Sequence, residues 1–116
     1  MKYMLLMYAN ESVAQKMTPE EYKAVFQTWQ SLGLELQAAG VLEANSGLAS
    51  VTNATSVRVR DGKTITADGP FAETHEQLGG FYILNCKDLD EAIGWAAKIP
   101  FAKYGTIEIR PTWSQQ

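Results

Sequence analysis

The sequence predicts an α+β fold in which two helices cover one face of an antiparallel sheet. Three observations indicate it: apolar runs at residues 2–9 and 79–86, a long amphipathic stretch between them, and a second helical pattern followed by an alternating strand. With 116 residues, 46% of them hydrophobic and 20% charged, the chain has the size and composition of one folded domain spanning residues 1–116.

The first strand is expected at residues 2–9, KYMLLMYA. It is short and apolar at both alternating sets of positions, which is typical of a central strand covered on both faces. A signal peptide is disfavoured, because polar residues begin at Asn10 and no small-residue cleavage site follows. No stretch approaches the roughly 18 apolar residues that a membrane span needs.

The first helix is predicted from Thr18 to Gly40. Thr18 is suited to the N-cap, Pro19 to the first helical position and Glu21 to a capping box, and Gly40 provides a stop. Apolar residues then recur every three or four positions and define one face: Tyr22, Val25, Phe26, Trp29, Leu32 and Leu36.

Residues 47–67 read as β-structure, with one strand in GLASVT and a hairpin of TSVRVR and TITA joined by a tight DGK turn. In this hairpin Val57 and Val59 face one way, while Arg58 and Arg60 face the other. One side of the hairpin is therefore expected to be solvated.

A second central strand is predicted at residues 79–86, GGFYILNC. The helix that follows begins at Asp88 with Glu91 in a capping box, and Pro100 closes it. The last strand, within GTIEIRPTW, alternates isoleucines with Glu108 and Arg110.

This order of elements is that of a ferredoxin-like sheet with two helices on one face. Because the central strands are apolar on the other face too, that face is expected to meet the same face of a second subunit. The result would be a twofold homodimer with a cavity between the sheets.

Charge and cysteine content narrow the classes of partner. The net charge is -3, and no Lys/Arg cluster could neutralise several phosphates in a row, so nucleic-acid binding is disfavoured.

Cys86, the single cysteine, lies in an apolar run and is expected to pack as a small hydrophobe. One His and one Cys cannot build a usual zinc site, and no phosphate-binding glycine loop is present, so we expect no metal or cofactor. A reducing cytoplasm fits this pattern.

The segment DGPFAETHEQLGGFY, residues 68–82, carries the most chemistry. His75 is the only imidazole, and its ordinary pKa near 6.5 would suit a general acid or base that Asp68, Glu73 or Glu76 could orient. The alternative is a structural turn, in which Asp68, Gly69 and Pro70 set the backbone and Phe71 anchors it in the core. Gly79 and Gly80 indicate a bulge or a close backbone approach, for example to a partner subunit or a ligand.

Two pairs of charged residues, each containing arginine, offer a different chemistry. Glu108 and Arg110 share a face of the last strand, as Arg58 and Arg60 share a face of the hairpin. Either pair could clamp a carboxylate ligand, or serve as a surface or interface ion pair. Four aromatic residues could line the inter-sheet cavity or simply belong to the core: Tyr3, Tyr8, Tyr82 and Trp113. Trp29 and Trp95 are assigned to helix faces.

The blocks DGPFAETHEQLGGFYIL, DLDEAIGWAAKIP and GTIEIRP resemble the YCII-related, or DGPF-domain, family. The resemblance runs from the first strand to Pro111. It implies a dimeric α/β barrel of ferredoxin-like subunits, usually small and cytoplasmic. Some members resemble lyases or dehydrochlorinases in which a His-Asp pair is the proposed acid and base, but that histidine lies early in the first helix, where this chain has TPEEYKAVF. That mechanism is therefore not carried over, and the family's common lysine at the His75 position favours a plain cation there.

The leading expectation is a cytoplasmic homodimer that binds a small anionic or aromatic metabolite near residues 68–76. A lyase- or isomerase-type proton transfer would then use His75 or one of the neighbouring carboxylates, Asp68, Glu73 or Glu76, as the base. Arg110 or Arg58 would be the charge partner, with Tyr82 and Glu108 at the ligand. The alternative is a non-catalytic interaction module associated with sigma-factor-type transcription regulators, as the resemblance implies for other members.

Overall fold

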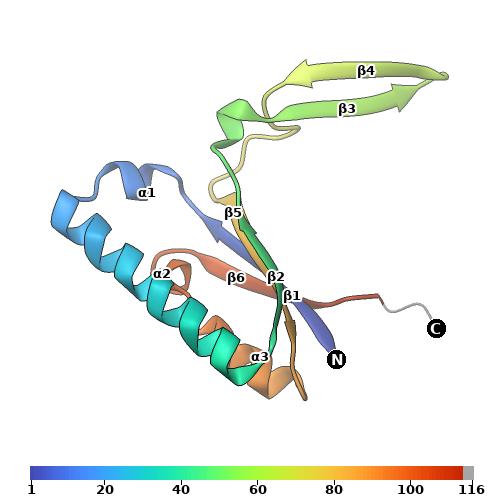
Figure 1. Ribbon diagram of the computed structural model, residues 1–116. Helices are drawn as coiled ribbons and strands as arrows, with labels where there is room; N and C mark the ends of the chain where they lie inside the picture. The colour runs from blue at the N-terminus through green and yellow to red at the C-terminus, as the bar shows by residue number, and fades with distance from the viewer. Residues whose placement is uncertain (114–116) are drawn as a thin grey trace.

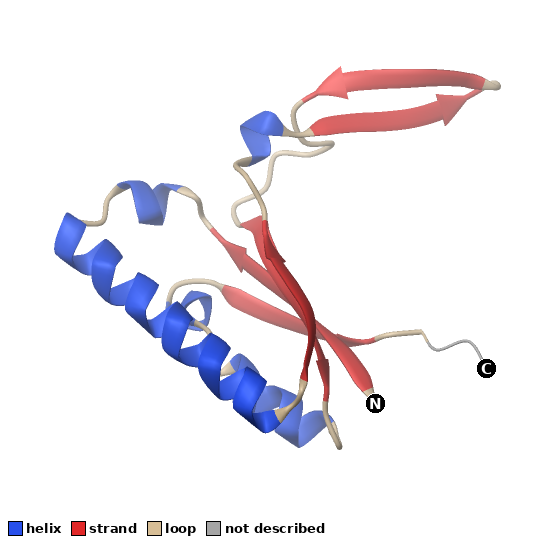
Figure 2. Cartoon of the chain, in the orientation of Figure 1, coloured by secondary structure: helices blue, strands red, loops and turns tan. Residues whose placement is uncertain are grey.

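A computed structural model describes residues 1–113 of the chain. Four strands form an antiparallel sheet in the order β2-β5-β1-β6: β1 (Lys2–Ala9), β2 (Leu42–Gly47), β5 (Gln77–Asn85) and β6 (Thr106–Pro111). Helices α2 (Pro19–Ala39) and α3 (Leu89–Ala96) lie on one face of this sheet (Figures 1 and 2). Counted along the chain, the sheet order is 2-3-1-4, which confirms the predicted ferredoxin-like α+β fold.

The central strands are β1 and β5, as the apolar runs predicted. Alternate residues of β1 are buried against the helices, and they pack with buried residues of α2, β5 and α3. The most completely buried large side chains are Leu5, Leu32, Leu36, Leu84 and Ile99. Cys86 is also buried among them, as predicted for a small apolar side chain.

Helix α2 begins and ends where the sequence predicts. The hydroxyl of Thr18 accepts a hydrogen bond from the Glu21 amide, the Glu21 carboxylate accepts one from the Thr18 amide, and Gly40 ends the helix at φ 70°. Only the second half of the predicted apolar face is covered, however, because Tyr22 and Phe26 remain exposed while Leu32 and Leu36 are buried. The first half of α2 extends beyond the sheet.

One strand and one helix end differ from the prediction. The strand expected in GLASVT lies earlier, at Leu42–Gly47, and residues 51–53 form a short 3₁₀ helix instead, η1 (Val51–Asn53). The reason is that β2 is a largely exposed edge strand whose residues, LEANSG, show no apolar alternation.

The second helix also ends earlier than predicted, at Ala96, and Pro100 begins another 3₁₀ helix, η2 (Pro100–Lys103). A short helix that the sequence did not predict, α1 (Ser12–Gln15), follows β1.

The predicted hairpin forms, but outside the main sheet. Strands β3 (Thr55–Arg60) and β4 (Lys63–Asp68) make a two-stranded sheet of their own. Asp61 and Gly62 join them with φ angles of 52° and 74°, the positive pair that a two-residue hairpin turn of type I′ requires. In Figure 1 this hairpin projects away from the sheet, on the side opposite α2 and α3.

The molecule is extended for its mass. Its radius of gyration is 16.3 Å, whereas a compact chain of this length has one of about 13 Å. Its accessible surface is 8295 Å² for 12.8 kDa, while a compact monomer of that mass exposes about 6,300 Å². No helix in the described part of the chain is long and apolar enough to cross a membrane.

Candidate functional site

The loop between β4 and β5 borders a partly open cavity of about 760 Å³. Three parts of the chain build its wall: the end of β1 with the start of β5, the 3₁₀ helix η1, and the loop itself. The lining residues are Tyr8, Val51, Thr52, Asp68, Pro70, Phe71, Ala72, Glu73, Thr74, Glu76, Gln77 and Leu78. We call this the loop cavity.

The loop begins at a point fixed by backbone geometry. Gly69 has φ 91°, a conformation that residues with a Cβ rarely adopt. Its amide donates a hydrogen bond of 2.6 Å to the carbonyl of Ala54, and its carbonyl accepts one of 2.9 Å from the Ser56 hydroxyl. The Asp-Gly-Pro step therefore ties the first residues of the loop to the chain that enters the hairpin.

The end of the loop is held by Gln77. Its side-chain amide donates to the carbonyl of Thr74 at 2.6 Å, and its side-chain oxygen accepts from the Glu11 amide at 2.9 Å. The Thr74 hydroxyl also donates to the Glu76 carbonyl. These bonds connect the loop to the turn that follows β1.

Glu11 fixes the position of η1, which is the remaining wall of the loop cavity. One carboxylate oxygen accepts a hydrogen bond from the Val51 amide at 2.9 Å, and the other accepts from the Ser50 hydroxyl at 2.8 Å. Since the Ser50 hydroxyl also caps η1 by accepting from the Thr52 amide, Glu11 positions η1 against the end of β1.

The lining is acidic, hydroxylated and aromatic. It contains the carboxylates of Asp68, Glu73 and Glu76, whereas none of its described residues is a lysine, arginine or histidine. Tyr8 and Phe71 add aromatic rings. Such a wall suits an aromatic body bearing a hydroxyl or amino group, because the carboxylates accept hydrogen bonds and repel anions.

The structure brings only some of the predicted residues together. Asp68 and Glu76 line the loop cavity, while His75 is exposed on the same loop and is not part of the lining. Arg58 is exposed on the hairpin. Glu108 and Arg110 are exposed on β6, opposite Leu6 and Met4 of β1, so they share the helix-free face of the sheet as the alternation predicted.

Tyr82 lies on the other face. It is buried opposite Leu5, and its ring stacks on Trp29 of α2 with a centroid separation of 6.2 Å. Burial raises the pKa of its phenol above 10.0. Of the two interpretations offered for Tyr3 and Tyr82, the structure agrees with the core one, because both are buried on the helix side of the sheet.

Phe71 also departs from expectation. Its side chain is 79% exposed, so it does not anchor the turn in the core of the chain. Gly79 and Gly80 do have the predicted roles, since the pairing of β1 with β5 shifts between Met7 and Tyr8 and leaves Gly79 as the extra residue of a bulge. A Cβ on Gly80 would lie 2.7 Å from the Ser46 carbonyl oxygen, so the close approach is to the chain's own backbone.

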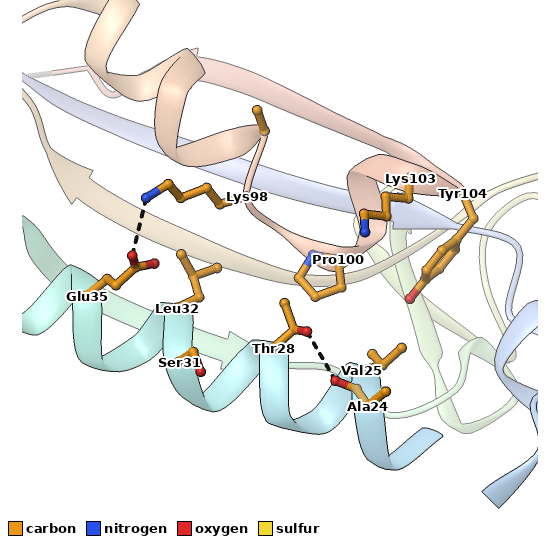
Figure 3. A pocket seen from close by; sticks show the side chains of 11 residues that line it. Ala24, Val25, Thr28, Ser31, Leu32, Glu35, Lys98, Pro100, Lys103 and Tyr104 are labelled. Atoms are coloured by element: carbon orange, nitrogen blue, oxygen red, sulfur yellow. Dashed lines mark hydrogen bonds and ion pairs between the residues drawn. The ribbon is translucent and has the colours of Figure 1, made fainter. Parts of the chain in front are cut away.

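A second hollow, of about 510 Å³, lies between α2 and η2 (Figure 3). Lys98 at its edge is paired with Glu35 at 3.4 Å, while the amino group of Lys103 and the hydroxyl of Tyr104 point into the space above Pro100 and Val25. Burial raises the pKa of the Tyr104 phenol. Sequence reasoning did not select these residues, because only the packing of α2 against the distant KIPFAKYG segment brings them together. We call this hollow the α2–η2 groove.

Two comparisons with known proteins show the family of the chain. The model of the YCII-related domain matches residues 1–115. An uncharacterised protein of Rhizobium meliloti (strain 1021) is 39% identical over 113 residues, which cover 96% of this chain and 91% of that protein.

Proposed function

This chain belongs to the YCII-related domain family, and we propose that it binds a small aromatic metabolite in the loop cavity, one wall of which includes Asp68, Pro70 and Phe71. The observation that carries the proposal is the composition of the cavity wall. Three acidic residues, Tyr8 and Phe71 are among the residues that line about 760 Å³, a volume within the range of small-molecule sites.

The carboxylates narrow the class of ligand. Among the described lining residues there is no cation to neutralise an anionic ligand, and the arginines expected to do so, Arg58 and Arg110, lie elsewhere in the chain. An aromatic compound with a phenol, alcohol or amine matches the wall better than a plain acid.

Binding is better supported than proton transfer. His75 does not line the loop cavity, and Asp68 is exposed in the single chain. A general base must lie within hydrogen-bond reach of the proton it removes. Of the residues expected to act as base, the three acidic ones line the cavity, so a lyase- or isomerase-type step would fall to Asp68, Glu73 or Glu76.

Homodimer formation is the second part of the proposal. The helix-free face of the sheet carries a stripe of half-buried apolar side chains from β1 and β5: Met4, Leu6, Tyr8, Phe81 and Ile83. The chain exposes about 2,000 Å² more than a compact monomer of its mass. A standard interface buries about 800 Å² on each partner. A second copy packed on this stripe accounts for much of that excess.

A thermal-shift screen tests the ligand proposal. Phenols, aromatic amines and aromatic acids are compared on the wild-type chain and on Glu76→Gln, Phe71→Ala and His75→Ala. We expect phenols or amines to raise the melting temperature, Glu76→Gln and Phe71→Ala to lose most of that shift, and His75→Ala to keep it. A shift that neither lining variant reduces would remove the loop cavity as the site.

The aromatic acids in the same screen are expected to bind at a different place from the phenols and amines. Lys103 and Tyr104 line the α2–η2 groove, so a carboxylate that stabilises the chain is expected to act there. Lys103→Ala should abolish that shift and leave the phenol and amine shifts unchanged. If Glu76→Gln instead removed the acid shift, the assignment of ligand classes to the two hollows would be wrong.

A further inference from the structure

The hairpin of residues 55–68, which we call the arm, has almost no cover from its own chain. Every residue of β3 and β4 is exposed except Ser56. Val57 and Val59 are each 61% exposed and Ile65 is 49% exposed. A two-stranded hairpin alone is at best marginally stable in water, so this one is expected to gain stability from another surface.

The two faces of the arm differ in chemistry. The pairing places Val57 opposite Thr66 and Val59 opposite Thr64, so one face is β-branched, and its one charged residue is Asp68, opposite Thr55 at the base of the arm. The other face is cationic, because Arg60 lies opposite Lys63 and Arg58 lies opposite Ile65. Burial of a valine is favourable and burial of an unpaired arginine is not, so the valine face is the one suited to contact.

The position of the arm indicates what it contacts. In Figure 1 it projects past the end of the sheet on the side that α2 and α3 leave bare. The apolar stripe of the sheet faces that same side. A molecule seated on the stripe would therefore lie beside the arm.

The exposed area indicates how large that molecule is. The excess of about 2,000 Å² over a compact monomer exceeds the roughly 800 Å² per partner of a standard interface. It is in the range of the larger interfaces of obligate homodimers.

We propose that the valine face of the arm packs against a second copy of this chain. The arm of each subunit would then contact the other subunit, in addition to the contact between the two sheets. This inference rests on the homodimer of the proposed function and names a second contact within it. The cationic face of the arm stays in water.

Two double variants on opposite faces of the arm test it. Val57→Asp/Val59→Asp places charges on the proposed contact, and Arg58→Ser/Arg60→Ser changes the other face at neighbouring positions. Sedimentation velocity over a dilution series gives the dimer dissociation constant of each. We expect the aspartate pair to raise it at least tenfold and the serine pair to leave it within about threefold of wild type.

The outcomes separate the two proposals. A wild-type chain that stays monomeric at micromolar concentration overturns the homodimer and the arm contact together. A stable wild-type dimer that both variants retain equally overturns the arm contact alone. Because the arm is outside the core, both variants are expected to keep the wild-type far-ultraviolet circular dichroism spectrum.

Hydrogen exchange provides a second measurement that needs no variant. Amides of residues 55–68 should exchange more slowly in concentrated wild-type samples than in dilute ones, in proportion to the dimer present. If the dimer population changes between samples but the amide exchange rates of residues 55–68 do not, the arm does not contact the second subunit. This result would overturn the proposal even if a variant failed to fold.

Discussion

Glu11 and Val51, forty residues apart in the chain, are joined by a hydrogen bond of 2.9 Å from the Val51 amide to the Glu11 carboxylate. The same carboxylate accepts from the Ser50 hydroxyl. This contact sets the position of η1, and hence of Val51 and Thr52 in the wall of the loop cavity.

Glu11→Ala should therefore weaken both the fold and the cavity. The Val51 amide is partly buried and would lose its partner, which typically costs about 1 kcal/mol of unfolding free energy. Urea denaturation measures this loss. Glu43→Ala is the matched control. Among residues 1–113 the Glu43 side chain makes only an exposed 4.0 Å ion pair, with Lys2, so its loss should change stability by less than about 0.5 kcal/mol. Equal stability of the two variants would contradict the role of Glu11.

Two glycine-to-alanine changes should have opposite signs. The Cβ of Gly80→Ala would meet the Ser46 carbonyl oxygen at 2.7 Å and the Met7 side chain at 2.8 Å, so the sheet must shift, at a cost of about 1–3 kcal/mol. The Cβ of Gly33→Ala, within α2, meets nothing within 4 Å and should stabilise the helix by up to about 1 kcal/mol. The melting temperatures of the two variants, compared with wild type, show whether each change stabilises or destabilises the chain. Destabilisation by both would refute the claim that alanine at position 33 stabilises α2.

Thr18→Ala should destabilise α2 by about 0.5–1 kcal/mol, because it removes the hydroxyl that accepts from the Glu21 amide. Thr28→Ala in the same helix is the control. Thr28 is exposed and its hydroxyl donates to the Ala24 carbonyl, so replacing it with a better helix former should leave stability unchanged or raise it slightly. Circular dichroism during urea titration measures both, and a neutral Thr18→Ala would show that the first turn of α2 contributes nothing to stability.

Stability should fall at alkaline pH, in part through Cys86. Burial raises the pKa of the Cys86 thiol above its ordinary value of 9.0, and the Glu91 carboxylate raises it further. The unfolded chain then loses this proton at a lower pH than the folded chain, so the contribution is complete below about pH 9 and is lost as the pH rises through the folded pKa. Cys86→Ala should show a shallower decline in unfolding free energy between pH 8 and 10.5 than wild type. Parallel curves would mean that the thiol does not contribute.

The helix caps illustrate what was predictable. Thr18, Pro19, Glu21 and Gly40 act on backbone groups within a few residues of themselves, so their pattern located both ends of α2. The same is true of the Asp61-Gly62 turn and of the apolar runs that became β1 and β5. Strand β2 was misplaced because an exposed edge strand needs little apolar patterning.

The site depended on contacts that local pattern does not encode. The DGPF segment was selected from the sequence, but its partners in the cavity wall, Tyr8 and Val51, come from other parts of the chain. The same holds for the α2–η2 groove, where Lys103 and Tyr104 meet a helix that ends more than 60 residues earlier.

The sequence by itself determined the family, the α+β class, the two central strands and the caps of α2, because each depends on side-chain periodicity or on hydrogen bonds between near neighbours. Only the tertiary structure decided that the hairpin leaves the sheet, that Tyr82 faces the helices, and that Asp68 and Glu76 line a cavity while His75 does not. These are matters of which distant surfaces meet, and periodicity cannot specify that.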